Sequence, residues 1–262
     1  MKVTMLGCGT SVGVPALGNA GWGKCDPSNP KNRRQRCAIL VEKDGFNLLV
    51  DAGPDIRNQL LAAGNPRIHA VLITHTHADH VAGLDDLRTF YWPDRIKIPV
   101  YGTASTLDEL KSRFHYLFVK NERSPTYFEP SLEVNQISPG DRLEIGGIDV
   151  KVLRQFHGRI ESLGFVFDEK LGYSTDVVDM PEESFAELHD LHTWIVEGLR
   201  ATEHQAHAHF DLTFSWIERL KPQMAYLTHL GLEADYDETT AICPDGVEPV
   251  SYTHLRAHET VM

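Results

Sequence analysis

The chain has 262 residues, of which 42% are hydrophobic and 24% charged, and its formal net charge is −12. This length allows one large domain or two small ones, and the composition is ordinary for a soluble globular protein. The acidic balance argues against a nucleic-acid partner, because phosphates require a basic surface, and the segment 31–36 is a local basic exception. Every apolar run is shorter than the roughly 20 residues that cross a bilayer. We therefore expect a cytoplasmic protein without a membrane span, and a strand rather than a secretion signal at residues 1–8.

Short apolar runs rich in β-branched residues predict nine strands. We expect them at residues 2–7, 37–43, 46–53, 70–75, 98–102, 148–156, 163–169, 193–199 and 224–230. Helical patterns lie between them, at residues 55–64, 80–91, 181–190 and 211–222. Asp55 is a suitable N-cap, Gly64 and Pro222 mark helix ends, and Pro181 opens the third helix. Strands that come first in succession and then alternate with helices indicate an α/β fold with two sheets and helices outside.

A glycine-rich loop follows the first predicted strand, at residues 7–15. Its glycines resemble the phosphate-binding turn of dinucleotide-binding proteins. Residues 15–23, however, are too rich in proline and glycine to begin a helix. Because that motif binds phosphate at a helix N-terminus, a plain tight turn is the better interpretation.

Three histidines and an aspartate follow directly after the strand predicted at 70–75. They are His75, His77, Asp79 and His80. His75 and His77 are two apart in extended chain and project to the same side, whereas Asp79 and His80 lie where the chain turns into a helix. This geometry favours two adjacent metal ions over one. Imidazole and carboxylate ligands suit zinc, manganese or iron, and the spacing does not choose among them.

Further candidate ligands lie at other predicted strand ends. His157 ends one strand before a glycine, Asp176 follows a short polar turn, and His229 ends another apolar strand. Each alone is more often a structural residue. Together with the quartet they provide four contacts to each of two divalent ions, if Asp176 is shared.

Asp51 ends the strand that precedes the quartet. A carboxylate there can accept a hydrogen bond from the second ring nitrogen of a ligand histidine. Helix capping or a turn is the alternative role.

These residues match a known pattern. The motif at 74–84, THTHADHVAGL, is preceded by VDAG at 50–53 and resembles the metallo-β-lactamase superfamily over roughly residues 2–249. The resemblance implies an αββα four-layer sandwich with a dinuclear metal site. It assigns one ion to His75, His77 and His157, and the other to Asp79, His80 and His229, with Asp176 bridging.

Within the superfamily, the segments 7–15, 32–42 and 208–212 look most like the PhnP-type phosphodiesterases, relatives of tRNase Z that act on phosphoribosyl 1,2-cyclic phosphate in phosphonate metabolism. The resemblance implies hydrolysis of a small cyclic phosphodiester by a hydroxide between two zinc or manganese ions, with iron as a further candidate. Asp79 and His209 are then the catalytic residues, and His209 holds the phosphate or protonates the leaving alkoxide.

The loop that contains His209 allows other interpretations from its residues alone. The segment HQAHAHFD at 204–211 is equally readable as solvated surface before a helix. His204 and His207 are less favoured candidates for the role of His209.

The early loop departs from the best-known PhnP-type members, which bind a structural zinc there through several cysteines. Only Cys25 remains in residues 18–30, and Leu232 stands where the family's completing histidine would be. We do not expect that zinc, and its loss weakens the transfer of the named substrate. All the cysteines are widely spaced, without a CxxC pair, which indicates buried or incidental thiols: Cys8, Cys25, Cys37 and Cys243.

Three alternatives share parts of the pattern. A tRNase Z-like endonuclease has the same metal site, but the chain is acidic and shows no long arm for gripping tRNA. A lactonase, thioesterase or β-lactamase-type hydrolase uses the metals to attack a carbonyl. A non-enzymatic accessory protein similar to the coenzyme PQQ protein B is opposed by the complete ligand set. The resemblance is also compatible with a homodimer.

Two segments carry expectations of their own. Residues 112–130 are aromatic and partly basic, and either wall a substrate pocket or form an ordinary packed helix and loop. Residues 250–262 lack the apolar alternation of a closing strand and lie beyond the resemblance. We interpret them as a foreign tail, so that the domain comprises residues 1–249.

Overall fold

The structure is a computed structural model that describes residues 1–120 and 129–251. Its contacts divide the chain into two compact units. Unit 1 contains the described residues of Met1–Leu6 and Ala38–Ser138, and unit 2 those of Gly7–Cys37 and Pro139–His254. Each unit has its own sheet.

The sheet of unit 1 has six strands in the order of the sequence. They are β1 (Lys2–Gly7), β2 (Ala38–Lys43), β3 (Phe46–Val50), β4 (Ala70–Leu72), β5 (Ile98–Gly102) and β6 (Leu132–Gln136). β2 and β3 form an antiparallel pair, and β3, β4, β5 and β6 run parallel to one another. The carboxyl ends of these four strands therefore meet at one edge of the sheet.

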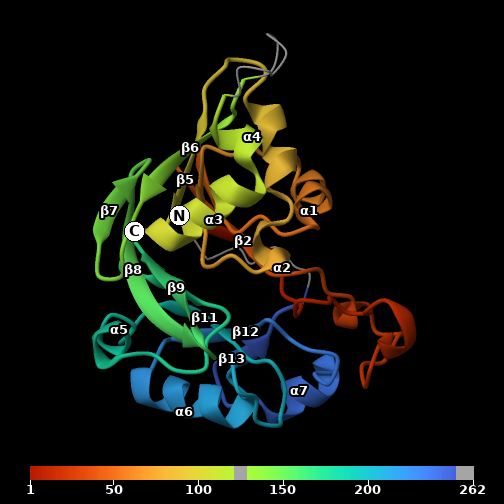
Figure 1. The fold of residues 1–262 in the computed structure, drawn as a ribbon. Coiled ribbons are helices and arrows are strands. Elements are labelled where there is room, and N and C mark those ends of the chain that lie inside the picture. The colour runs from red at the N-terminus through yellow and green to blue at the C-terminus, as the bar shows by residue number, and fades with distance from the viewer. Residues whose placement is uncertain (121–128, 252–262) are drawn as a thin grey trace. The chain divides into compact units, whose positions relative to one another are not determined.

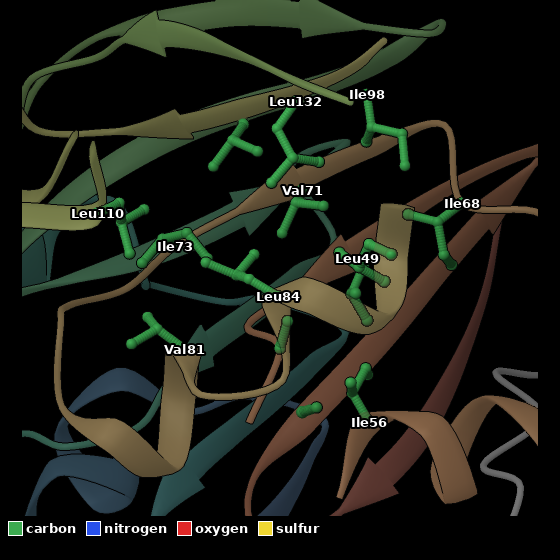
Figure 2. Close-up of a cluster of buried hydrophobic side chains, with 14 of the residues drawn as sticks. Leu49, Ile56, Ile68, Val71, Ile73, Val81, Leu84, Ile98, Leu110 and Leu132 are labelled. Carbon is green, nitrogen blue, oxygen red and sulfur yellow. The ribbon is translucent and has the colours of Figure 1, made fainter. Parts of the chain in front are cut away.

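Helices cover this sheet and close the core of unit 1. They are α1 (Ile56–Ala62), α2 (Ala78–Val81), the 3-10 helix η3 (Leu84–Phe90), α3 (Ala104–Arg113) and α4 (His115–Phe118). Each contributes apolar side chains to one cluster with the strands. Figure 2 shows Leu49 and Val71 from the sheet directed toward Leu84 and Leu110 from the helical side. Burial of a side chain of this size stabilises the fold by about 1.5–3 kcal/mol.

The helix predicted at 80–91 is wrong in detail, because the chain forms two short helices there. Gly83 interrupts them: its N–H donates to the carbonyl of Ala52 at 2.8 Å instead of continuing an α-helical ladder. A Cβ at position 83 would lie 2.0 Å from the carbonyl oxygen of Gly53, so only glycine fits. This close approach holds the segment after His80 against the segment after β3.

The sheet of unit 2 has seven strands in the order β13-β12-β11-β10-β9-β8-β7. Their bounds are β7 (Arg142–Ile145), β8 (Ile148–His157), β9 (Ile160–Phe167), β10 (Leu171–Ser174), β11 (Thr193–Glu197), β12 (Met224–Thr228) and β13 (Val247–Pro249). β10, β11, β12 and β13 are parallel, and β9 is antiparallel to both β8 and β10. The ends of β8, β10, β11 and β12 therefore share one edge.

The helices of unit 2 are α5 (Glu182–Ala186), α6 (Phe210–Leu220) and α7 (Tyr236–Ile242), with the short 3-10 helices η1 (Gly18–Ala20) and η2 (Pro30–Asn32). Figure 1 shows α5, α6 and α7 on the same side of the sheet. Phe185 and Trp216 pack with the strand residue Trp194 in one buried cluster.

Most predicted elements are present, with shifted bounds. The strands predicted at 2–7 and 98–102 have the observed bounds, and the glycine-rich loop forms the expected tight turn, with Gly13 N bonded to Thr10 O. Asp55 is the N-cap of α1, but its side chain does not cap the helix. The elements of the described residues that were not predicted from the sequence are the strands β6, β7, β10 and β13, the helices α3 and α7, and the short 3-10 helices η1 and η2.

The described residues include no helix that is both long and apolar enough to cross a membrane. The tail predicted from residue 250 lies, beyond residue 251, outside the described residues. The same holds for positions 121–128 of the aromatic segment, of which residues 112–118 lie in α3 and α4.

Candidate metal centre

In unit 1, the predicted quartet lies just beyond the carboxyl end of β4. The rings of His75 and His77 are 4.6 Å apart between centroids, and those of His75 and His80 are 4.3 Å apart. Asp79 Oδ2 lies 3.1 Å from His80 Nε2. His75 and His80 are buried, whereas His77 is exposed. The four side chains thus lie close together, and ligand atoms of His75 and His77 belong to one possible metal-binding group and those of Asp79 and His80 to another.

Asp51 is the acceptor that organises this cluster. One of its oxygens, Oδ2, accepts from His80 Nδ1 at 2.7 Å and from Thr74 Oγ1 at 2.9 Å. The other, Oδ1, accepts from the backbone N–H of Thr74 at 2.9 Å. Because the hydroxyl of Thr74 donates to Asp51, it accepts from His75 Nδ1, which lies 3.0 Å away. Asp51 therefore positions His80 directly and His75 through Thr74.

Both the burial and the backbone conformation of Asp51 are energetically unfavourable. Complete burial raises the pKa of its carboxyl group, although His80 and Thr74 favour the charged form. Its backbone φ is +64°, in the left-handed region that non-glycine residues rarely adopt. Asp176 (φ 52°) and His229 (φ 56°) share this conformation. Such backbone strain costs of order 1 kcal/mol per residue and concentrates at functional sites.

In unit 2, the other predicted ligands lie at the shared edge formed by the ends of β8, β10 and β12. Asp176 Oδ1 lies 3.7 Å from His157 Nε2 and 3.6 Å from His229 Nε2. These separations are longer than hydrogen-bond distances. They are close to the distance of about 3.4 Å between two ligand atoms that each lie about 2.1 Å from one tetrahedral ion. The geometry fits an Asp176 that shares a metal ion with each histidine.

Glu197, at the end of β11, is the corresponding acceptor of unit 2. Its Oε1 lies 2.6 Å from His207 Nδ1 and 2.8 Å from His229 Nδ1. Its Oε2 accepts from the backbone N–H of Val177 at 2.5 Å. Burial acts to raise the pKa of Glu197, but the two histidines outweigh burial and bring the pKa below its ordinary value.

Sequence analysis missed Glu197. Its position at the end of an apolar strand, like that of Asp51, was the available signal. Ligand atoms of Glu197, His207 and His229 lie within 4.8 Å of one another, so this set is also compatible with metal binding. His207 further stacks on His229, with ring centroids 4.9 Å apart and planes 17° apart.

The donor set fits a divalent metal, because the histidine tautomers are consistent. His157 Nδ1 lies 2.7 Å from the carbonyl oxygen of Ala206. Nδ1 therefore faces an acceptor in His75, His80, His157 and His229. With the proton on Nδ1, each ring presents Nε2 as a neutral ligand atom. Burial also lowers the pKa of His157, against the opposite effect of Asp176, which favours the neutral form that binds metal.

His209 lies at the N-cap of α6 and is partly exposed. Among the described residues, no side chain or backbone group hydrogen-bonds its ring. His204 is exposed and contacts His207, at 4.9 Å between ring centroids. The three histidines of this loop thus have different surroundings, and the ring of His207 stacks on the predicted ligand His229.

The loop around Cys25 is fastened by hydrogen bonds to the segment after His229. Arg34 donates to the carbonyl of Ala234 at 2.7 Å, and Asn32 Nδ2 donates to Asp235 Oδ2 at 2.6 Å. Both Arg34 and Asn32 are buried. These contacts tie residues 32–34 to the chain that leads away from His229.

Comparison with known proteins identifies the family. The β-lactamase superfamily domain matches residues 46–230. A crystal structure of a diphosphatase from the PhnP family is 31% identical, with a TM-score of 0.85 over 95% of this chain and 94% of that one. A Zn²⁺-bound PqqB structure from Methylobacterium extorquens shares the fold, at 19% identity and a TM-score of 0.77 over 96% and 98% of the two chains.

Two curated relatives extend the comparison. An octanoyltransferase of Porphyromonas gingivalis is 34% identical over 95% of this chain and 51% of its own length. A ribonuclease Z of Bradyrhizobium is 32% identical over 53% of this chain and 46% of its own. The chain thus spans about half the length of the curated relatives that it matches. The predicted α/β fold is confirmed, and the chain belongs to the metallo-β-lactamase superfamily of hydrolases, in its PhnP-type branch.

Proposed function

We propose that the protein is a dinuclear metal-dependent phosphodiesterase that hydrolyses a small phosphodiester, cyclic ones included. The observation that carries this proposal is the common arrangement of the two ligand groups. In each, a buried carboxylate at a strand end orients the ligand histidines, which suits a structural framework for metal binding. The named activities of the similar diphosphatase and ribonuclease Z, both directed at phosphate bonds, favour a phosphodiester over a carbonyl substrate.

We assign the ligands as the family pattern does. His75, His77 and His157 hold one ion, Asp79, His80 and His229 hold the other, and Asp176 contributes to both. Divalent ions bound there would acidify a water molecule and neutralise charge on the phosphate. Zinc and manganese suit this donor set, and iron is a third candidate.

The chain's own residues then have separate tasks. Asp51 and Glu197 keep the ligand histidines in the tautomer that presents Nε2. Asp79 lies beside His80 and would hold the second ion together with it. His209 has a ring that is uncommitted within the described residues, so it can hold the phosphate or protonate the leaving alkoxide.

His207 serves a different purpose from His209. Its Nδ1 faces Glu197 and its ring stacks on His229. We propose that it supports the orientation of His229. Replacing His209 by Ala should therefore lower kcat by about 10²-fold, as loss of a general acid does, without loss of metal. Replacing His207 should weaken metal binding.

A second candidate is a carbonyl-directed hydrolase that acts on an acyl ester or thioester. It is favoured by the octanoyltransferase relative, which is similar over nearly all of this chain. The similarity covers only half of that relative, so its named activity can belong to the other half. The endonuclease and the non-enzymatic accessory protein remain less favoured proposals. A cytoplasmic location, a role in phosphonate metabolism and a homodimer remain part of the proposal.

One assay separates these candidates. The metal-loaded full chain is tested against bis(p-nitrophenyl) phosphate, a 2′,3′-cyclic nucleotide, p-nitrophenyl octanoate, a lactone and precursor tRNA. Turnover of the first two substrates, lost in the variant Asp176→Ala, supports the proposal. Rapid ester or lactone opening without diester turnover contradicts it and supports the second candidate.

A further inference from the structure

The residue between the first two histidines of the motif is held from two sides by one helix. Arg113 donates through Nη1 to the carbonyl oxygen of Thr76 at 2.6 Å. The hydroxyl of Thr76 donates to Glu109 Oε2 at 2.5 Å. Arg113 and Glu109 also form an ion pair with each other on α3. Thr76, Glu109 and Arg113 thus form a closed set of three contacts, which we call the α3 clamp.

The helix that carries the clamp is itself firmly anchored. Thr103 caps its N-terminus by accepting from the N–H of Thr106 at 3.2 Å. Leu107 and Leu110 are buried in the core of unit 1, where Figure 2 shows Leu110 directed inward. Glu109 and Arg113, by contrast, are about two-fifths exposed, at 42% and 41%. The clamp therefore reaches outward from a fixed helix to the surface segment that contains His77.

The location of the clamp bears on both neighbouring histidines. In extended backbone, successive side chains point to opposite sides, so Thr76 projects away from the side of His75 and His77. Holding its hydroxyl and its carbonyl fixes the orientation of the peptide units next to both imidazoles. His75 has a further support through Thr74, and the ring of the exposed His77 lies edge-on to that of His75.

The clamp differs from an ordinary surface ion pair. The same helix carries such a pair in Lys111 and Asp108, whose charged atoms are 3.0 Å apart. A pair of that kind is worth little, because solvent screens it. The α3 clamp adds a charge-assisted hydrogen bond to a backbone carbonyl and a hydrogen bond to a carboxylate, both of which reach out of the helix to one residue.

We propose that Glu109 and Arg113 are positioning residues that hold Thr76, so that His75 and His77 meet one metal ion together. This inference rests on the proposed two-ion site and adds the residues that set the affinity of its first ion. Partners that orient metal ligands typically affect metal affinity by about 10–100-fold. The clamp acts one residue away from the ligands, so we expect about tenfold weaker binding of one ion.

The test is a Zn²⁺ titration of the metal-free full chain by calorimetry. The variants are Arg113→Ala and Thr76→Val, with Thr76→Ser as the conservative variant that keeps the hydroxyl. Lys111→Ala is the matched control, because it breaks an ion pair on the same helix without touching Thr76. The first two variants should bind one ion about tenfold more weakly and the other ion as the wild type does. Thr76→Ser and the control should bind both ions normally.

Two results separate the clamp from the proposed function. A wild type that binds fewer than two ions overturns the two-ion site itself, and the clamp's role with it. A wild type that binds two ions, with Arg113→Ala and Thr76→Val unchanged or weakened equally for both ions, overturns the clamp alone. Thermal unfolding of the metal-free variants tests the merely structural explanation, which requires a loss of stability absent from the control.

Discussion

In both groups of candidate ligands, a buried carboxylate at the end of a strand accepts hydrogen bonds from histidines, and the two carboxylates lie on different sheets. In unit 1, one carboxylate oxygen of Asp51 accepts hydrogen bonds from two side chains, and the other accepts from a backbone N–H. In unit 2, Glu197 does the same with two histidines and the N–H of Val177. Both carboxylates are fully buried. A buried charged carboxylate needs several hydrogen-bond donors to offset the cost of its burial. In both units those donors include histidines that are candidate metal ligands.

The difference between the groups lies in what the second donor does. Asp51 reaches its second histidine, His75, through the hydroxyl of Thr74. Glu197 contacts two rings directly, and one of them, His207, is absent from the family's ligand pattern. Glu197 therefore supports one assigned ligand, His229, in two ways: directly, and through the ring of His207 that stacks on it. We therefore expect the effect of replacing a supporting residue to follow the directness of its contacts with the candidate ligands.

Removing Asp176, the proposed shared ligand, should abolish metal binding and diester hydrolysis together. Asp176→Ala takes away the oxygen that faces the Nε2 atoms of His157 and His229. We expect loss of bound metal, measured by atomic absorption, together with at least about 10³-fold lower diester turnover, because metal ions supply several kcal/mol of transition-state stabilisation. Full activity of this variant would refute the sharing of Asp176.

Replacing the direct acceptor of unit 2 should have the next largest effect. Glu197→Gln replaces one carboxylate oxygen by an NH₂ group, which cannot accept from the donors that it faces, whether these are the two histidines or the N–H of Val177. We expect about 100-fold weaker metal binding, at the upper end for such partners. Circular dichroism checks that the variant is folded. A folded Glu197→Gln protein with wild-type metal affinity would contradict the role of Glu197 as the acceptor that holds His229.

The matching change in unit 1 is Asp51→Asn. The amide again meets donors on both sides, His80 and Thr74 on one and a backbone N–H on the other. Because only one histidine is contacted directly, we expect a loss of metal affinity of about 30-fold, within the usual range. A larger loss here than in Glu197→Gln, in the same calorimetric titration, would reverse the proposed order.

The smallest effect should come from the relay alone. Thr74→Val keeps the shape of the side chain but removes the hydroxyl between Asp51 and His75, while the contact of Asp51 with His80 remains. We expect about tenfold weaker metal binding, at the lower end of the range. The double variant with Asp51→Asn should be no worse than Asp51→Asn itself, since both break one path. Additive losses would show that Thr74 acts independently.

The positions of the candidate ligands at strand ends could be predicted from the sequence better than the bounds of the elements that carry them. Strand ends followed by histidine or aspartate are local patterns, and they located His157, Asp176 and His229 correctly relative to β8, β10 and β12. The helix predicted at 80–91 failed because Gly83 bonds to Ala52, a contact with a residue far along the chain. Apolar periodicity contains no information about such an approach.

The sequence by itself determined the family, the α/β fold class and the candidate metal-ligating residues, because motif spacing and strand ends are properties of contiguous chain. It also indicated Asp51 as a partner of a ligand histidine, which is His80. Only the tertiary structure decided that Glu197 supports His229 and that α3 holds Thr76. These partners lie on other elements, and only packing of the strands and helices against each other brings their polar atoms within bonding distance.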